Sequence, residues 1–357
     1  MVEFLYDQQL MPYKRSDFVP FSLDSGRVAA NLEAAYEQWL DARQQLALMP
    51  VSMYWQTKAN GDYLAVKRCS SDSGTTIGRR SEETEAKLAE FAQRKELIKK
   101  RVSDADTTIG DRAAQYRALR LPTIPDRQAE IVRALDVAEL LRNDLMVVGT
   151  NAFTAYSLVC NARFPTGVEE TEDFDLAWCR GSRVSLTRTT PASPERSSLM
   201  AVLQGVDSSF RLNPKKPYQA LNANNYEVAL LMAPSLALPK TEVFEPMVSL
   251  PEQEWLLRGR PLSVVVATIR QRACPLYVPD PRWMALHKLW LSKKPERNAL
   301  KKPKDMRQGD VLLSACRYFL ADSYPIDIDF VLELPAELRD LFNEWAHTNG
   351  FDPLNPS

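Results

Sequence analysis

The sequence is poor in the residues that most often carry nucleophilic or transition-metal chemistry. It contains only two histidines, His287 and His347, in 357 residues. A Ser-His-Asp or Cys-His catalytic triad would have to use one of them, and a histidine-rich metal site is excluded. If the protein is an enzyme, we expect its catalytic groups to be carboxylates. A metal held by carboxylates alone would be a hard cation such as magnesium or manganese.

Other absences narrow the class further. The five cysteines are odd in number, far apart and without a CxxC pair, which argues against a disulfide framework or a structural zinc site and is typical of a reducing cytoplasm. No apolar run reaches the roughly 18 to 20 residues of a membrane helix, and the N-terminus lacks the pattern of a signal peptide. The formal net charge is only -1, so any attraction to nucleic acid must be local. We expect a cytoplasmic protein without membrane contact.

The length predicts two or three domains, since a domain averages roughly 150 residues. We expect an N-terminal helical and β-hairpin extension over residues 1–120, a core over 121–240 and a mostly helical C-terminal domain over 241–357. In the extension, helical periodicity covers residues 25–49, a hairpin with an Asn60-Gly61 turn covers 51–68, and a polar helix capped by Ser81 covers 81–102.

The core has the element order of an α/β protein with a mixed sheet. Asp126 is a candidate cap for a helix that ends near residue 142. The next elements expected are a strand at 145–149, a helix at 151–162, a strand at 173–179, a short helix at 193–206 and two strands within 218–234. Three helices are expected after the core, at 279–294 with Asp280 and Pro281 at its start, at 305–321, and at 335–350 with Gly350 at its end.

Two aspartates one residue apart, Asp173 and Asp175, stand inside the apolar segment "TEDFDLAW". On a strand, side chains at i and i+2 leave the same face, about 7 Å apart. Burying two carboxylates is costly unless a cation pairs with them. At a strand end they would converge on one or two divalent cations that bridge the phosphate oxygens of a nucleotide.

The segment "VVGTNAFTAY" supplies a second feature, in which Gly149 and Thr150 stand where a strand gives way to a helix. Glycine permits the turn, and the free N–H groups at a helix start attract an anion. Each feature alone has an ordinary explanation, because a Gly-Thr pair after a strand is usually a turn and a D-x-D is often a solvated strand end. Their combination in strand-turn-helix context favours a phosphoryl- or nucleotidyl-transfer site.

These residues resemble the DNA polymerase β-like nucleotidyltransferase superfamily. More narrowly, "VGTNA…AY" and "TEDxD" resemble a bacterial family with this fold. Flanking segments extend the similarity over most of residues 51–315, including "IGRRSEETEAK", "NNYEVALL" and "VPDPRWMALHKLWLS…KKPKDMRQ".

The resemblance implies attack of a hydroxyl on the α-phosphate of a nucleoside triphosphate, with magnesium (or manganese) as cofactor and pyrophosphate released. It assigns the triphosphate to Gly149, Thr150 and Asn151, and the metals to Asp173 and Asp175. A third carboxylate, which completes such sites, is expected at Ala229. Glu227 lies on the same strand face, about 6 to 7 Å away. Either Glu227 substitutes for it, or the site is slow, binds one metal or is inactive.

Lys288 is a further candidate for phosphate binding, because its helical neighbours Ala285 and Ser292 are small; a surface lysine is the alternative. Two basic segments, residues 293–307 and the pair Arg79-Arg80, are either solvated or contacts for a polyphosphate or an RNA backbone.

Three functions remain open. The leading hypothesis is a magnesium-dependent nucleotidyltransferase acting on RNA or tRNA, a protein or a small molecule, with a toxin-like or phage-defence role suggested by analogy. The first rival is a nucleotide-binding or protein-interaction module that lost its third acid, and the second is a phosphoester hydrolase.

Overall fold

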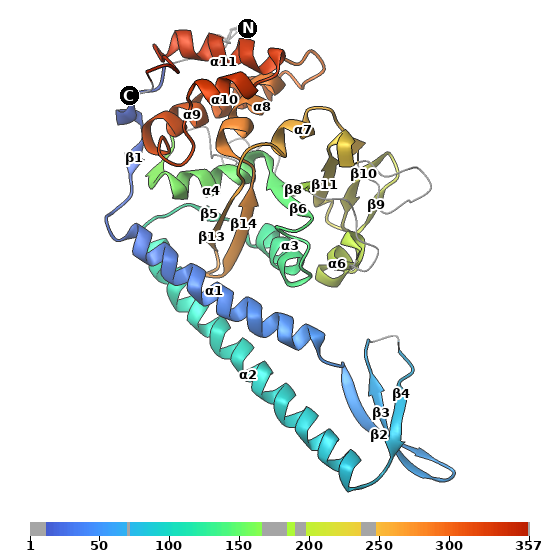
Figure 1. Ribbon diagram of the computed structural model, residues 1–357. Helices are drawn as coiled ribbons and strands as arrows, with labels where there is room; N and C mark the ends of the chain where they lie inside the picture. Colours follow the sequence, from blue (N-terminus) through green and yellow to red (C-terminus); the bar gives the residue numbers. More distant parts are fainter. Residues whose placement is uncertain (1–11, 70–71, 166–183, 190–197, 237–247, 356–357) are drawn as a thin grey trace.

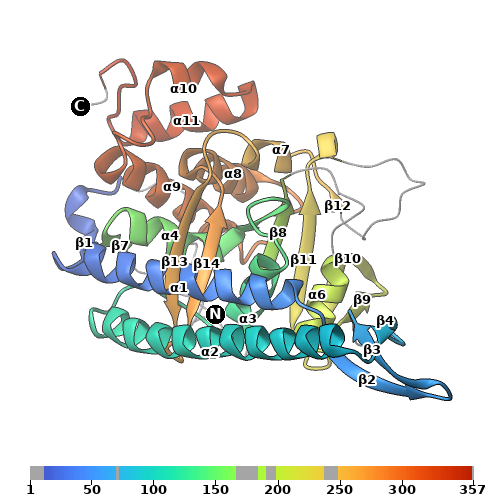
Figure 2. The ribbon, with the colours of Figure 1, turned by 60° about the horizontal axis from the view of Figure 1, so that its bottom comes forward.

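The computed structural model describes residues 12–69, 72–165, 184–189, 198–236 and 248–355. An α/β body carries a long arm made of two antiparallel helices, α1 (Ser25–Leu48) and α2 (Glu82–Ala118), and a three-stranded sheet lies at the far end of the arm (Figure 1). Figure 2 shows the two helices side by side, with this sheet beyond the N-terminal end of α2. Among the described residues, no helix is long and apolar enough to cross a membrane.

The sheet at the end of the arm confirms the predicted hairpin. Strands β2 (Ser52–Lys58) and β3 (Gly61–Lys67) pair around the Asn60-Gly61 turn, and β4 (Thr75–Arg79) pairs with the other edge of β3. Gly61 has a φ of +121°, a conformation that side chains disfavour. Ser81 caps α2 as predicted, since its side chain accepts a hydrogen bond from the backbone N–H of Thr84.

Helix α2 is longer than the predicted helix, which ended at residue 102. It continues to Ala118, and its last turns place Ile109, Ala113 and Tyr116 in the main core. These residues follow one another at helical spacing, so this end of α2 has an apolar face that the more polar beginning lacks. Packing of this face against the body accounts for the extra length.

A mixed sheet forms the centre of the second half of the chain. Its strands are β6 (Leu145–Val148), β8 (Val184–Arg188), β9 (Arg211–Asn213), β10 (Lys216–Leu221), β11 (Glu227–Met232) and β12 (Val248–Ser249). The order is β6-β8-β11-β10-β9, and β12 pairs with β11. The structure confirms the predicted strand at 145–149 and the two strands within 218–234, whereas the strand predicted at 173–179 lies outside the described residues.

A second sheet was not predicted from the sequence. Strands β13 (Leu262–Thr268) and β14 (Ala273–Val278) form an antiparallel hairpin, and the short β5 (Thr123–Ile124) pairs in parallel with β13. Both arm helices contact this hairpin. Because β13 and β14 are almost fully buried, they show continuous apolar runs rather than the alternation that identifies a half-exposed strand.

Helices surround the two sheets. They are α3 (Asp126–Val137), α4 (Ala152–Val159), α6 (Leu199–Val206), α7 (Gln253–Leu256), α8 (Pro281–Lys293), α9 (Lys302–Phe319), α10 (Ile328–Glu333) and α11 (Ala336–Thr348). The helices α8 to α11 gather at the end of the body opposite the arm (Figure 1). Near the N-terminus, β1 (Val19–Pro20) pairs with β7 (Ala162–Arg163), and single 3-10 turns cover Arg15–Asp17, Gly149–Asn151 and Pro234–Leu236.

The start of α3 corrects one prediction. Asp126 is not the cap of this helix, because the N-cap position belongs to Pro125 and Asp126 is the first helical residue. Its carboxylate instead accepts hydrogen bonds from the Thr268 hydroxyl at 2.6 Å and from the backbone N–H of Arg270 at 3.3 Å. Asp126 therefore joins α3 to the end of β13. The helix ends at Val137 rather than near 142.

Two of the C-terminal helices, α8 and α11, begin as predicted, whereas α9 begins three residues before the predicted residue 305 and α10 was not predicted. Asp280 accepts the backbone N–H of Arg282 and Pro281 is the first residue of α8. The last helix is followed by Gly350, whose φ is +55°. One apolar core runs through the molecule, with members from the arm helices, both sheets and α8 to α11.

Helices α8 and α9 pack closely at Gly309. A Cβ atom at this position would lie 2.6 Å from Leu289 Cγ and 2.7 Å from the carbonyl oxygen of Ala285. Since one of these atoms is backbone, the two helices would have to separate.

We expect Gly309→Ala to lower the free energy of unfolding by about 1–3 kcal/mol through overpacking. Gly110→Ala in α2 is the control, because nothing lies within 4 Å of its Cβ position; it should raise stability by up to about 1 kcal/mol. Urea unfolding of both variants measures the difference. Equal effects of the two substitutions would contradict the helix contact.

Candidate functional site

The central sheet has two chemically different faces. The pairing aligns Val148 with Ser185 and Ser185 with Ala229, so these three residues share a face. The opposite face is apolar and buried, with the members Val147, Val184, Leu186, Ala220, Val228 and Leu230. On the first face lie Ser185, Thr187, Gln219 and Glu227, which we call the polar face. Ser185, Glu227 and Ala229 are only half-buried, so this face is partly open.

Strand directions bring three chain positions to one edge of the sheet. Strand β6 is antiparallel to β8, and β8 is parallel to β11. The end of β6 therefore lies beside the beginnings of β8 and β11. Gly149, Val184 and Glu227 all stand at this edge, which we call the Gly149 edge. From the strand spacing, β6 and β11 are about 10 Å apart here.

The chain turns sharply at Gly149. Its φ is +78°, in the left-handed region, and an added Cβ would meet only the Ser185 side chain, at 3.9 Å. The requirement for glycine is thus conformational rather than a lack of space. The 3-10 turn Gly149–Asn151 leads directly into α4, so the predicted strand, glycine turn and helix are all observed. The helix is shorter than predicted and ends at Val159.

Thr150 of this turn contacts the C-terminal helices. Its hydroxyl oxygen accepts a hydrogen bond from Gln308 Nε2 of α9, at 3.3 Å. Gln308 is fully buried. Thr150 and Asn151 themselves are half-buried at the edge. Gln308 was not predicted as a site residue from the sequence, although it lies in the segment "KKPKDMRQ".

One helical turn before Gln308, Asp305 is the centre of a buried ion cluster. Lys288 Nζ donates to Asp305 Oδ1 at 2.9 Å, and Arg297 donates to Oδ2 at 2.7 Å. Lys288 is 4% exposed and Asp305 is 2% exposed. Burial alone would raise the pKa of Asp305, but the charges and hydrogen bonds of Lys288 and Arg297 outweigh it and lower the pKa below its ordinary value.

This cluster shows where the structure places Lys288. Its ammonium is held by Asp305, between α8 and α9, one turn of α9 before the Gln308 that contacts Thr150. The assignment of Lys288 to nucleotide binding stays a prediction. A lysine in this position supports the helices beside the Gly149 edge whether or not it also reaches a phosphate.

Glu227 is the first residue of β11 and lies on the polar face, with its Oε2 atom buried. Ala229 follows on the same face, about 7 Å along the strand, and aligns with Ser185. Glu227 is thus nearer than Ala229 to the Gly149 edge.

Asp173 and Asp175 lie outside the described residues. In the chain they precede Val184, the first residue of β8, which stands at the Gly149 edge. Within the part that the structure describes, no three His, Cys, Asp or Glu side chains gather to hold a metal ion.

A nucleotidyltransferase family model matches residues 126–326. The match covers more than half of the 357 residues. The chain belongs to this nucleotidyltransferase family. Comparisons with curated proteins and with solved structures gave no match.

The nucleotidyltransferase match begins at the first residue of α3 and includes the central sheet, the β13–β14 hairpin, α8 and α9. It contains the Gly149 edge and the Lys288–Asp305 cluster. It leaves out the arm, although the resemblance seen in the sequence began at residue 51. The match also crosses residue 240, where the sequence analysis placed the end of the core.

Breaking the buried cluster should be costly. We expect Lys288→Met to lower the free energy of unfolding by about 3 kcal/mol, because Asp305 keeps only Arg297. The double variant Lys288→Met/Asp305→Leu should recover part of this loss, since no buried carboxylate is left. Urea unfolding of both variants tests the cluster, and a single variant as stable as wild type would contradict it.

The histidine beside Lys288 predicts a pH dependence. His287 is 5% exposed, and neither ring nitrogen has a hydrogen-bond partner among the described residues. Burial, assisted by the charge of Lys288, lowers its pKa to about 3. The unfolded chain therefore binds a proton at this residue that the folded chain rejects, and stability is lost as pH falls below about 6.5.

We expect His287→Phe to remove about 2 kcal/mol of the stability loss between pH 7.5 and 5. His347→Gln is the matched control, because His347 is the other histidine of the chain and is exposed. Unfolding curves at the two pH values measure the effect. An unchanged pH dependence in the His287 variant would contradict the buried neutral imidazole.

Proposed function

We propose that this family member transfers a nucleoside monophosphate from a nucleoside triphosphate to a hydroxyl acceptor, with magnesium or manganese as cofactor. One observation supports this proposal above all. The Gly149 turn, the beginning of β8 and Glu227 meet at one edge of the sheet, beside a half-open polar face. Sequence places Asp173 and Asp175 in the stretch before β8.

The turn Gly149–Asn151 is the proposed contact for the triphosphate. Its backbone leads into α4, and N–H groups at the start of a helix favour an anion through their partial positive charge. Gly149 allows the turn, because its φ of +78° is a conformation that side chains disfavour. The hydrogen bond between Gln308 and Thr150 orients the threonine hydroxyl and positions this turn against α9.

The proposed metal ligands are Asp173, Asp175 and Glu227. The described part of this set fits a hard cation in chemical type, because Glu227 offers a carboxylate at the half-open edge. A bound divalent cation would neutralise the charge that develops on the transferred phosphate. In this scheme Glu227 takes the place of the third carboxylate expected at Ala229 and favours loss of the acceptor's hydroxyl proton.

The second candidate function is a module of the same family that binds a nucleotide or a partner without transfer. Ala229 favours it, because the position on the polar face nearest Ser185 lacks a carboxylate. The acceptor of the leading proposal is a hydroxyl of RNA or tRNA, of a protein or of a small molecule. A toxin-like or phage-defence role belongs to the same proposal.

Incubation of wild type with labelled nucleoside triphosphates, magnesium and candidate acceptors tests the proposal against the Asp173→Ala/Asp175→Ala variant. We expect label on an acceptor and release of pyrophosphate with wild type only. Binding of the triphosphate without transfer would favour the non-catalytic module. Release of phosphate or monophosphate without a labelled acceptor would indicate a hydrolase instead.

The role of Glu227 has its own test. We expect Glu227→Gln to lower the rate of transfer by about 100-fold or more, since the substitution removes a charge and a proton acceptor but keeps the size. Glu337→Gln is the control, because Glu337 is an exposed carboxylate on α11. A Glu227 variant that transfers as fast as wild type would remove Glu227 from the site without affecting the two aspartates.

A further inference from the structure

The sheet at the end of the arm also has two faces. In the pairing of β2 with β3, Ser52 lies opposite Lys67, Tyr54 opposite Ala65, Gln56 opposite Tyr63 and Lys58 opposite Gly61. In the pairing of β3 with β4, Tyr63 lies opposite Arg79 and Ala65 opposite Thr76. Directly opposed residues share a face. We call the face formed by these residues the outer face. Its side chains include three cations and two tyrosines but no Asp or Glu.

The inner face is different. It carries Met53, Trp55, Leu64 and Val66, together with Asp62. A Cβ at Gly78, on the same face, would touch Thr84 at 3.4 Å, so this face lies against the beginning of α2. Leu64 is fully buried there. The acidic group of the sheet is thus on the side that faces the arm helices.

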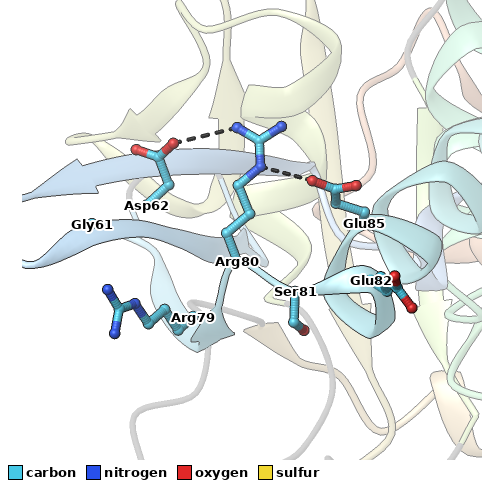
Figure 3. A pocket seen from close by; sticks show the side chains of 7 residues that line it. All are labelled: Gly61, Asp62, Arg79, Arg80, Ser81, Glu82 and Glu85. Atoms are coloured by element: carbon cyan, nitrogen blue, oxygen red, sulfur yellow. Dashed lines mark hydrogen bonds and ion pairs between the residues drawn. The ribbon is translucent and has the colours of Figure 1, made fainter.

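Two neighbouring arginines show the contrast directly (Figure 3). Arg80 points toward Asp62 and Glu85, and its guanidinium pairs with both, at 3.3 Å and 2.8 Å. Arg79 points away from this cluster, to the other side of the strands. Among the described residues it forms no ion pair. The charge of Arg80 is therefore neutralised within the protein, whereas the charge of Arg79 is presented to solvent.

The other two cations of the outer face behave like Arg79. Lys58 donates to the Thr76 hydroxyl at 3.0 Å and lies over the ring of Tyr63, 5.3 Å from its centroid. Lys67 is half-buried at the opposite end of β3. Within the described part of the chain, neither forms an ion pair. Asp72 of the following loop accepts hydrogen bonds from the backbone N–H groups of Arg68 and Gly74, and these bonds, assisted by the charge of Lys67, lower its pKa.

The spacing of these charges suits an extended polyanion. On β3, Lys67 lies six residues from Gly61, which is opposite Lys58, so the face is about 20 Å long between these strand positions. A stacked nucleic-acid strand has one phosphate per roughly 3.4 Å, so this length covers about six nucleotides. The Lys58 ammonium itself reaches back along the face, over Tyr63 to Thr76. Tyr63 is half-exposed among the cations and has the Lys58 ammonium over one face of its ring; a base that replaces this ammonium would stack on the ring.

The position of the sheet fits a long ligand. Ile109 is the first residue of α2 in the main core, and Glu82 begins the helix at the sheet. Helix α1 contacts the body as far as Gln44, whose side chain donates to the carbonyl oxygen of Asp136 in α3. At 1.5 Å per residue, α2 carries the sheet about 40 Å along the helix beyond Ile109. A small molecule or a nucleotide in the proposed site would not reach it, whereas a polynucleotide would.

We infer that the outer face binds single-stranded nucleic acid, with phosphates on Lys58, Lys67 and Arg79 and a base on Tyr63. Binding of a strand does not require nucleotidyl transfer, so this part of the inference does not depend on the proposed function. The further statement, that the bound strand is the class of acceptor, rests on the proposed function. Membrane docking is less suited to this face, because the paired positions that form it carry no aliphatic side chain larger than that of Ala65.

Fluorescence anisotropy with labelled 20-nucleotide RNA and DNA strands, without triphosphate or metal, tests the inference on the full chain. We expect Lys58→Ala/Lys67→Ala/Arg79→Ala to weaken binding at least 10-fold. The slope of log K against log salt should fall by about 2, at about 0.7 per lost phosphate contact. Tyr63→Leu should weaken binding about five-fold or more. The RNA and DNA arms show which sugar is preferred.

The control removes the same charge from the middle of the arm. Arg94, Lys99 and Lys100 are exposed on α2, and Arg94→Ala/Lys99→Ala/Lys100→Ala should bind like wild type. Thermal unfolding verifies that both triple variants are folded.

Failure of wild type to bind either strand, or equal loss in the two triple variants, would overturn the inference. Binding of anionic vesicles but of neither strand would overturn it in favour of a membrane surface. Nucleotide transfer by wild type without binding of either strand would contradict this inference but not the proposed function. Binding of strands without transfer would contradict the proposed function alone.

Discussion

The pairing of β8 with both β6 and β11 is the constraint on which the rest of the site depends. Because β8 runs antiparallel to β6 and parallel to β11, the end of the first strand and the beginnings of the other two meet at one edge. The same register divides the side chains into a buried apolar face and a half-open polar face. A shift by one residue would exchange these faces and turn Glu227 toward the core. The apolar row of Val147, Leu186 and Leu230 therefore holds the Gly149 edge in place.

The C-terminal helices stabilise this edge from the side. Gly309 lets α8 and α9 approach closely, and that approach brings Lys288 within hydrogen-bonding distance of Asp305. One turn further along α9, Gln308 reaches Thr150. A buried ion cluster of this kind adds little net stability compared with apolar packing, but it leaves few alternative arrangements of the helices around it. The position of the Gly149 turn therefore depends on contacts with residues more than a hundred positions later in the chain.

The three-stranded sheet at the end of the arm also has two chemically different faces. Its inner face combines apolar side chains with the Asp62–Arg80–Glu85 cluster, and its outer face keeps cations and tyrosines. Arg80 is paired with Asp62 and Glu85, whereas the outer face carries no acidic side chain. The outer face is therefore locally basic, although the net charge of the chain is only -1. The family match begins at residue 126, after the arm.

Local sequence patterns by themselves determined the hairpin around Asn60-Gly61, the cap at Ser81, the strand and turn at Gly149, the β10–β11 pair and the start of α8, because each depends on neighbouring residues. They also pointed to the nucleotidyltransferase family. Only the tertiary structure decided the rest. Asp126 bonds to β13 rather than to its own helix, α2 is extended by packing on the body, and the buried β13–β14 hairpin shows no alternation. The partner of Lys288 likewise depends on a helix contact that spacing cannot reveal. In each case the deciding interaction joins residues that are far apart in the chain. The free energy of that interaction depends on burial and on the position of a distant group.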